Sequence, residues 1–272
     1  MNSRDIAVLP IGIFDSGFGG LTVMRSLIEE LPCENIVYFG DTARLPYGEK
    51  SREDILLYTK EGLKFLEGLG VKLLFIACNT ACTAALEELE GEFSIPILGM
   101  IDPGIQEIEK ITGEGSIAIL STRATASSGI YGKKIQALFP EKKVISLPCP
   151  LFVPLIEEGY TQEPFVQEAV KETLRPLHKE KIGAAFLACT HYPLIKGVIS
   201  KELGGQVSII DPSSSCAKNV REELFKKGVL NLSKEPGKHQ FFVSQGVDKF
   251  QQFGSRFLGR SVDIVKILPK YS

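Results

Sequence analysis

The sequence of 272 residues contains no tryptophan, only three histidines and no long apolar run. A membrane-spanning helix needs roughly 18 or more consecutive apolar residues, whereas the first apolar stretch here is only as long as one strand. The polar beginning, residues 1–5, does not resemble a signal peptide. These absences argue against a membrane partner and make the cytoplasm the expected location.

An excess of charge of either sign is also absent. Lys and Arg total 31 and Asp and Glu total 33, which gives a formal net charge of −2. The basic residues are scattered, so the pattern does not predict a nucleic-acid surface. In a reducing compartment the six cysteines are expected to be free thiols rather than a disulfide framework.

Metal ligands are scarce. Cys78 and Cys82 have the spacing C-x₃-C, but a zinc site needs about four Cys or His ligands in a recognisable pattern. A second pair is lacking, and Cys189-Thr190-His191 is a poor substitute for one. We therefore expect no metal.

What the chain does contain is a regular alternation of strand-like and helix-like segments. This pattern predicts an α/β protein with parallel sheets in doubly wound units. The expected strands cover residues 6–14, 36–39, 71–77, 95–101, 116–120, 144–147, 184–188, 207–210, 240–243 and 262–267. The main expected helices cover residues 21–31, 51–68, 79–89, 105–111, 128–138, 151–158, 164–177, 216–224 and 248–257.

Two short stretches, residues 73–80 and 184–191, look like copies of each other. Each is an apolar run that ends in Ala-Cys followed by small polar residues. Their comparable positions predict a divergent duplication with two pseudo-symmetric domains and the site in the cleft between them. We expect the tail to return to the first domain, which then covers residues 1–100 and 212–272, while the second domain covers residues 101–211.

Each of these stretches places a cysteine at the carboxyl end of a buried strand, where open α/β sheets bind ligands. Most free cysteines are inert packing, and that interpretation suits Cys33, Cys149 and Cys216. Cys78 and Cys189 differ because a strand end followed by a helix start offers N–H groups and a positive dipole, which lower the pKa of a thiol. We expect these two thiols to face one active site from opposite sides.

The glycine-rich loop over residues 15–20 does not match a nucleotide motif. The dinucleotide pattern would need glycine in place of Thr22, and the nucleoside-triphosphate loop would need Lys and Ser or Thr in place of Phe18 and Gly19. What remains is a turn that could bind a carboxylate through backbone N–H groups.

Polar residues at other strand ends have two interpretations. Asp15, Asp41 and Asp211 could cap the following helices or serve the site. Asp15 is the stronger site candidate, because its loop is expected on the same sheet edge as Cys78. His191 follows Cys189 by two residues, so it is expected to be a general acid or the partner of a substrate group.

Five motifs together resemble the glutamate racemases and occur in the order typical of that family. The resemblance implies a cofactor-independent racemase that interconverts L- and D-glutamate and supplies D-glutamate for the bacterial cell wall. It also implies two facing α/β domains and a homodimer. The matching motifs cover residues 14–23, 41–48, 77–81, 149–155 and 187–193.

The resemblance also assigns roles to individual residues. It implies that Cys78 acts on D-glutamate and Cys189 on L-glutamate, that Asp15 and His191 assist, and that Asp41 and Glu157 support them. Glu158 is adjacent to Glu157, which leaves the last assignment open between the two. The implied substrate contacts are Asp15, Ser16, Pro46, Tyr47, Gly48, Asn79, Thr80, Thr125, Thr190 and His191. The chain departs from the family at Thr42, where Asn is common, and at Ser121, where Gly is common.

The chemistry explains why two thiols would be needed. Racemisation removes the α-proton from one face and returns a proton to the other, which two bases on opposite faces achieve without crossing the substrate. Without an imine cofactor the α-carbon is weakly acidic, so N–H groups and hydroxyls must stabilise a carbanion-like transition state in a water-poor cleft. The motifs contain no obvious arginine clamp, so the candidates for holding carboxylates are Ser16, Asn79, Thr80, Thr125 and Thr190.

Three alternatives stay open. The protein could racemise aspartate or another acidic amino acid. It could be a cysteine hydrolase with Cys189 as nucleophile and His191 as base, which would leave Cys78 without a role. It could also be a two-lobed binding module for acidic amino acids.

Overall fold

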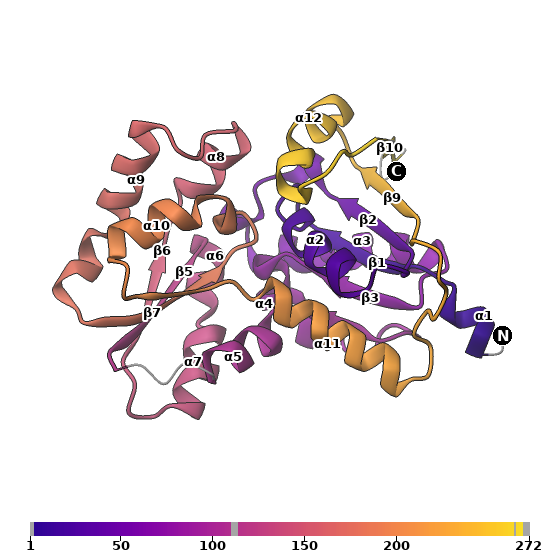
Figure 1. Cartoon of the computed structure of the whole chain (residues 1–272), viewed down its shortest axis with the longest axis horizontal. Helices are drawn as coiled ribbons and strands as arrows, with labels where there is room; N and C mark the ends of the chain where they lie inside the picture. Colours follow the sequence, from indigo (N-terminus) through magenta and orange to yellow (C-terminus); the bar gives the residue numbers. More distant parts are fainter. Residues whose placement is uncertain (1–2, 110–113, 264, 269–272) are drawn as a thin grey trace.

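The computed structural model describes residues 3–109, 114–263 and 265–268, and it contains two parallel β-sheets that lie side by side (Figure 1). The first sheet has the order β10-β9-β2-β1-β3-β4, and the second has the order β6-β5-β7-β8. All neighbouring strands within both sheets are parallel. The strands are β1 (Ile11–Asp15), β2 (Ile36–Gly40), β3 (Leu73–Ile76), β4 (Ile97–Gly99), β5 (Ser116–Ser121), β6 (Val144–Pro148), β7 (Ile182–Ala188), β8 (Ser208–Ile210), β9 (His239–Val243) and β10 (Val265–Ile267).

The two sheets repeat the same strand order. The run β2-β1-β3-β4 corresponds to β6-β5-β7-β8, so β1 is equivalent to β5 and β3 to β7. In each half the order reverses between the first and third strands, and such a switch point opens a crevice at the carboxyl ends of the strands. The expected two-part parallel α/β fold is confirmed, and both halves direct a crevice toward the same region.

The helices cover both sheets and connect the halves. Helix α2 packs against α11 and α12, and α3 packs against α4. Helix α4 also contacts α6 of the second half, and α5 contacts α7. The helices are α1 (Ser3–Ala7), α2 (Leu21–Glu30), α3 (Arg52–Gly68), α4 (Asn79–Leu89), α5 (Ile101–Glu109), α6 (Arg123–Ser128), α7 (Ile130–Leu138), α8 (Phe152–Glu157), α9 (Pro164–Leu174), α10 (Lys196–Leu203), α11 (Ser213–Lys226) and α12 (Val247–Leu258). Short 3₁₀ turns are η1 (Thr42–Arg44), η2 (Tyr47–Glu49), η3 (Arg175–Lys179) and η4 (Tyr192–Ile195).

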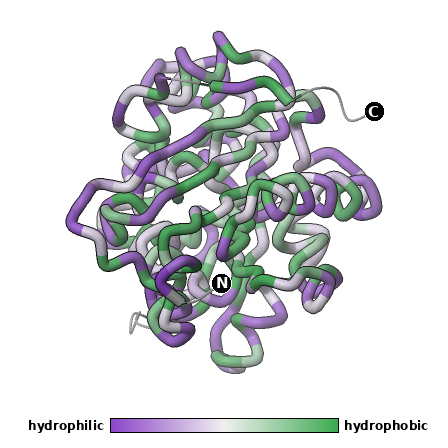
Figure 2. Tube along the Cα trace, turned by 90° about the vertical axis from the view of Figure 1, so that its right-hand side faces the viewer, coloured by the Kyte–Doolittle hydropathy of each residue, from purple (hydrophilic) through white to green (hydrophobic). Residues whose placement is uncertain are grey.

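The central strands are apolar except for Asp15 at the end of β1, because both of their faces are covered. Every residue of β1, β2 and β3 is buried, as expected for parallel strands between helix layers. Along the helices, hydrophobic and hydrophilic residues instead alternate within each turn (Figure 2), which matches one buried and one solvated face. None of the helices in the described part of the chain is long and apolar enough to cross a membrane.

Several predicted boundaries differ from the structure. The expected strand over 6–14 is wrong at its start, because residues up to Ala7 form α1 and β1 begins only after Pro10, which has no N–H for a strand ladder. The expected strand over 95–101 is shortened to β4, since Ile101 already begins α5. The expected helix over 128–138 is preceded by α6 and begins after Gly129, which has a φ of +66°.

The expected helix over 51–68 is confirmed as α3. Ser51 caps this helix, and its Oγ accepts the N–H of Asp54 at 3.1 Å. The tail strands β9 and β10 join the first sheet beside β2. The domain boundaries near Met100 and Asp211 stay a prediction. Ile111, which the helical pattern includes, lies outside the described residues.

Candidate active site

A cavity lies where the carboxyl ends of the two sheets face each other. It is lined from the first half by Ser16, Leu45, Pro46, Tyr47, Gly48, Glu49, Cys78, Asn79 and Thr80, and from the second half by Thr122, Cys149, Pro150, Val153, Pro154, Glu157, Cys189, Thr190 and His191. Its walls therefore come from the strand ends and loops on both sides, and both expected cysteines belong to them.

Cys78 occupies the N-cap position of α4, directly after β3. Its Sγ accepts the N–H of Ala81 at 3.4 Å and lies 3.5 Å from Ser16 Oγ. Burial and the nearby Asp15 carboxylate nevertheless raise the pKa of the Cys78 thiol to about 12. The expected lowering by the helix start is therefore wrong for this structure, because desolvation of the thiolate outweighs the N–H contact.

Asp15 lies behind Cys78 and does not line the cavity. Its Oδ1 accepts the N–H of Gly17 at 2.8 Å, while its buried Oδ2 has no hydrogen-bond partner among the described residues. Burial raises the pKa of this carboxyl, whereas the charge of His191 lowers it in part. Asp15 thus interacts with Cys78 and His191 through its charge. It does not line the cavity.

Cys189 has a different environment, which is built by His191 and Glu157. Cys189 Sγ lies 3.8 Å from His191 Nδ1, and His191 Nε2 lies 3.0 Å from Glu157 Oε1. Burial by itself lowers the pKa of His191, but its hydrogen bonds to Cys189 and Glu157 and their charges raise it to about 10. The protonated imidazole therefore lies beside the Cys189 sulfur.

The backbone after Cys189 also differs from the expected helix start. A 3₁₀ turn, η4, follows, and α10 begins only at Lys196. Pro193 lies in the first turn of η4 and supplies no N–H. The His191 ring packs edge-on against Phe257 of α12, with centroids 5.4 Å apart.

The two halves contact each other directly beside His191. Thr22 Oγ1 donates a hydrogen bond to the carbonyl of Thr190 at 3.0 Å. A Cβ added to Gly19 would lie 2.2 Å from Thr190 Oγ1 and 2.5 Å from His191 Nδ1. Residue 19 must therefore be glycine for the halves to approach this closely.

A second contact between the halves is formed by three threonine hydroxyls. Thr80 Oγ1 lies 2.9 Å from Thr122 Oγ1 and 3.1 Å from Thr125 Oγ1. Thr122 also caps α6 by accepting the N–H of Thr125 at 3.3 Å. A Cβ on Gly48 would approach the Thr122 side chain to 2.8 Å, so this wall of the cavity is closed by direct contact of the two halves.

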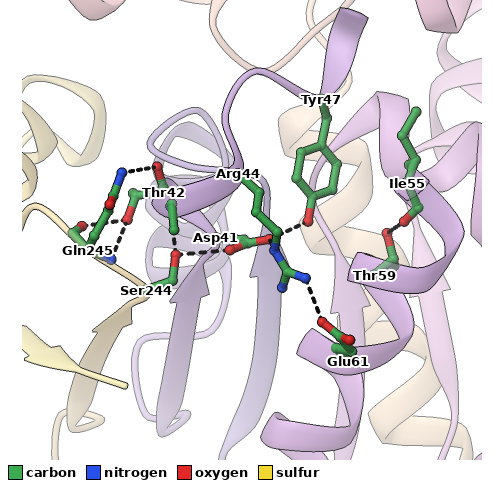
Figure 3. A network of polar contacts seen from close by, with 10 residues as sticks. Asp41, Thr42, Arg44, Tyr47, Ile55, Thr59, Glu61, Ser244 and Gln245 are labelled. Carbon is green, nitrogen blue, oxygen red and sulfur yellow. Dashed lines mark hydrogen bonds and ion pairs between the residues drawn. The ribbon is translucent and has the colours of Figure 1, made fainter. Parts of the chain in front are cut away.

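Asp41 lies outside the cavity, in the network shown in Figure 3. Its Oδ2 accepts hydrogen bonds from Arg44 Nε at 2.6 Å and from the Tyr47 hydroxyl at 2.7 Å, and its Oδ1 accepts one from Ser244 Oγ at 2.9 Å. Arg44 also binds Glu61. Both carboxylate oxygens of Asp41 are thus engaged in holding the loop that presents Tyr47 and Gly48 to the cavity.

The structure brings most of the expected site residues together. Those that line the cavity are Cys78, Cys189, His191, Glu157, Ser16, Pro46, Tyr47, Gly48, Asn79, Thr80 and Thr190. Glu158 pairs instead with Lys249 near the surface, so Glu157 is the carboxylate beside His191. Asp15, Asp41 and Thr125 lie behind the lining residues.

Sequence reasoning missed several lining residues, among them Thr122 and Cys149. Thr122, and not the expected Thr125, lines the cavity, because Thr122 is the residue that directly follows β5. Cys149 was assigned to inert packing, although the break Pro148-Cys149-Pro150 after a strand was a usable signal. The other missed residues are Leu45, Glu49, Pro150, Val153 and Pro154.

The C-x₃-C spacing has a packing role. Cys82 Sγ accepts the N–H of Met100 at 3.3 Å and contacts the carbonyl of Ile76 at 3.1 Å. Within the described ranges, no three or more His, Cys, Asp or Glu side chains are grouped so that they could bind a metal ion.

Comparison with known proteins identifies the family. The Asp/Glu/Hydantoin racemase family model matches residues 11–220. The chain is 43% identical over 249 residues to a glutamate racemase of Geobacter metallireducens, covering 92% of each. A solved glutamate racemase isoform from Bacillus anthracis has a TM-score of 0.91 and 38% identity, covering 96% of this chain and 98% of that chain.

A glutamate racemase from Francisella tularensis, solved in complex with D-glutamate, has a TM-score of 0.90 and 38% identity over 97% of this chain and 98% of that one. The chain therefore belongs to the Asp/Glu/hydantoin racemase family. It is an isomerase of the amino-acid racemase type, and the resemblance read from its motifs is confirmed.

Proposed function

We propose that this protein is a glutamate racemase that interconverts L- and D-glutamate with two cysteine bases and no cofactor. The single observation that supports this most strongly is that Cys78 and Cys189, each at the end of an equivalent strand, line one cavity from opposite halves. The glutamate racemases to which the chain is similar support the choice of substrate.

In the direction from L- to D-glutamate, the Cys189 thiolate removes the α-proton and becomes a thiol. The Cys78 thiol donates its proton to the opposite face of the α-carbon and becomes a thiolate, so one proton leaves the substrate and one arrives. The starting forms match the surroundings, because His191 is held protonated beside Cys189 while burial keeps Cys78 protonated. The reverse reaction starts from the Cys78 thiolate and the Cys189 thiol.

The substrate carboxylates need donors, which the cavity supplies without an arginine. The N-terminus of α4 follows Cys78, and the polar side chains of Ser16, Asn79, Thr80 and Thr190 line the same space. Backbone N–H groups at a helix start bind anions, and in a site with little water they stabilise negative charge that develops at the α-carbon and its carboxylate. Closure of the two halves would exclude that water.

The wider biological setting belongs to the same proposal. A glutamate racemase would supply D-glutamate for peptidoglycan in the bacterial cytoplasm, and the family resemblance implies a homodimer. The two domains would be residues 1–100 with 212–272, and residues 101–211.

Proton NMR of L-glutamate with the purified protein in D₂O, with polarimetry alongside and no added cofactor, tests the activity. We expect loss of the α-proton signal together with decay of the optical rotation toward zero. Exchange with aspartate but not with glutamate would reassign the substrate, and exchange with neither would overturn the proposal.

One observation favours a second candidate. Cys189, His191 and Glu157 form a chain of contacts of the kind that activates a cysteine nucleophile for hydrolysis. A hydrolase would not need Cys78, so a Cys78→Ala variant would keep its activity toward esters or amides. The racemase requires both thiols.

A further inference from the structure

Tyr131 reaches from the second half of the molecule to a residue of the cavity wall in the first half. It lies in α7, and its hydroxyl donates a hydrogen bond to Oδ1 of Asn79, the first residue of α4, at 2.5 Å. Tyr131 does not line the cavity itself. The contact therefore acts on the site through Asn79.

The phenol of Tyr131 is a reliable donor. The side chain is buried, its ring packs against Phe186 of β7 with centroids 5.2 Å apart, and burial raises its pKa well above the ordinary value. The group therefore keeps its only O–H proton, which it donates to the Asn79 carbonyl oxygen. This bond sets which way the planar amide of Asn79 faces.

The amino end of that amide has no hydrogen-bond partner among the described residues. Asn79 is only 3% exposed, and its Nδ2 makes no hydrogen bond to any described residue. A buried amino group without a partner is costly, which indicates that a ligand completes it. Asn79 lines the cavity at the start of α4 beside Cys78, and a donor in that place suits an anionic oxygen.

We propose that Tyr131 is a positioning residue: by binding Oδ1 of Asn79 across the interface between the two halves, it turns Nδ2 toward a substrate carboxylate. This inference rests on the proposed function and adds a residue that the motifs do not assign. It also links substrate binding to the relative position of the two halves, because the donor and the acceptor belong to helices of different halves.

Tyr131→Phe is the direct test, since it keeps the ring that packs on Phe186 and removes only the hydroxyl. Binding of D-glutamate is measured by calorimetry, and KM and kcat are measured in both directions. We expect Kd and KM to rise about 10-fold, the effect of one lost hydrogen bond, with a smaller change in kcat. Tyr160→Phe, at an exposed tyrosine, is the matched control and should bind like the wild type.

A double-mutant cycle with Asn79→Ala separates positioning from a general structural role. In the Asn79→Ala background, Tyr131→Phe should cause no further rise in Kd, because its effect passes through the amide. Asn79→Asp keeps the acceptor for Tyr131 but replaces the amino donor by an anion, so it should bind D-glutamate at least as poorly as Asn79→Ala.

An unchanged Kd in Tyr131→Phe would overturn the inference. So would a rise in Kd on Tyr131→Phe that is equally large in the wild-type and Asn79→Ala backgrounds. A lower melting temperature with unchanged Kd would also overturn it, since that result assigns Tyr131 to folding alone. The binding measurement is independent of turnover. A wild type that binds glutamate but exchanges no α-proton would refute the racemase while the Tyr131 comparison still stands, and a wild type that binds neither enantiomer would refute both.

Discussion

The two catalytic candidates occupy equivalent positions in a duplicated architecture but have different surroundings. Cys78 caps an α-helix and has the buried Asp15 carboxylate behind it, whereas Cys189 precedes a 3₁₀ turn and has His191 and Glu157 beside it. The surroundings of Cys78 favour its neutral thiol, whereas Cys189 has a protonated imidazole beside it. The pseudo-symmetric fold thus places the two sulfur atoms in equivalent positions, and their local neighbours make the two surroundings different.

This difference has a mechanistic consequence. A two-base racemase needs one thiol and one thiolate at the start of each turnover. Two identical environments would not determine which of the two cysteines carries the proton. In the proposed mechanism, the neutral Cys78 thiol and the protonated His191 beside Cys189 match the form that would accept L-glutamate.

The largest expected effect comes from removing either thiol. Cys78→Ala and Cys189→Ala should each reduce racemisation by roughly 10³-fold or more, because each removes the base for one face and the acid for the other. Polarimetry with both enantiomers measures this. Cys33→Ala, at a cysteine that does not line the cavity, should retain activity, and near-normal turnover in either cavity variant would rule out the two-base mechanism.

Glu157→Gln is expected to impair proton transfer at Cys189, because Glu157 binds the His191 that lies beside this cysteine. The loss of a charge-assisted hydrogen bond should lower kcat/KM about 10- to 100-fold. Because Glu157 helps to raise the pKa of His191 to about 10, its removal should move the alkaline limb of the kcat/KM profile to lower pH.

The pH profile of the wild type, measured from pH 6 to 11, is the reference for this shift. Glu158→Gln, which alters the neighbouring carboxylate that pairs with Lys249, is the matched control and should leave the limb in place. An unshifted limb in Glu157→Gln would show that His191 does not hold its proton through this contact.

Asp15→Asn tests whether the Asp15 carboxylate contributes to the raised pKa of Cys78. Loss of the carboxylate removes one of the two main causes that raise the pKa of Cys78, so this pKa should fall by about one unit. The rate of iodoacetamide labelling at Cys78, followed by peptide mass spectrometry against pH in a Cys189→Ala background, reports the change. A labelling midpoint equal to that of the parent variant would contradict the electrostatic role of Asp15.

The smallest effect on chemistry is expected at Asp41. Because its oxygens hold Arg44, Tyr47 and Ser244, Asp41→Asn should lower the free energy of unfolding by about 1 to 3 kcal/mol and reduce kcat less than about 10-fold. Urea unfolding and steady-state kinetics measure the two effects. Ser244→Ala should give a weaker version of the same pattern. A loss of turnover as large as that of the cysteine variants, with normal stability, would make Asp41 a catalytic group.

The sequence by itself determined the architecture and the identity of the two thiols. The apolar runs before Cys78 and Cys189 are long enough for buried strands and alternate with helix-like segments, and a parallel strand directs its carboxyl end toward the crevice of the sheet. The motifs around them were specific enough to identify the family. These are local properties, so they are readable along the chain.

Only the tertiary structure decided how the polar groups divide their roles. The contacts of His191 with Glu157 and of Tyr131 with Asn79 join residues 34 and 52 positions apart, and no local pattern predicts such pairs. The same holds for the pKa of Cys78, where burial outweighs the helix start that the sequence showed. Desolvation and hydrogen bonds between residues far apart in the sequence depend on how the chain packs in three dimensions, and this is why they emerge only once the chain has folded.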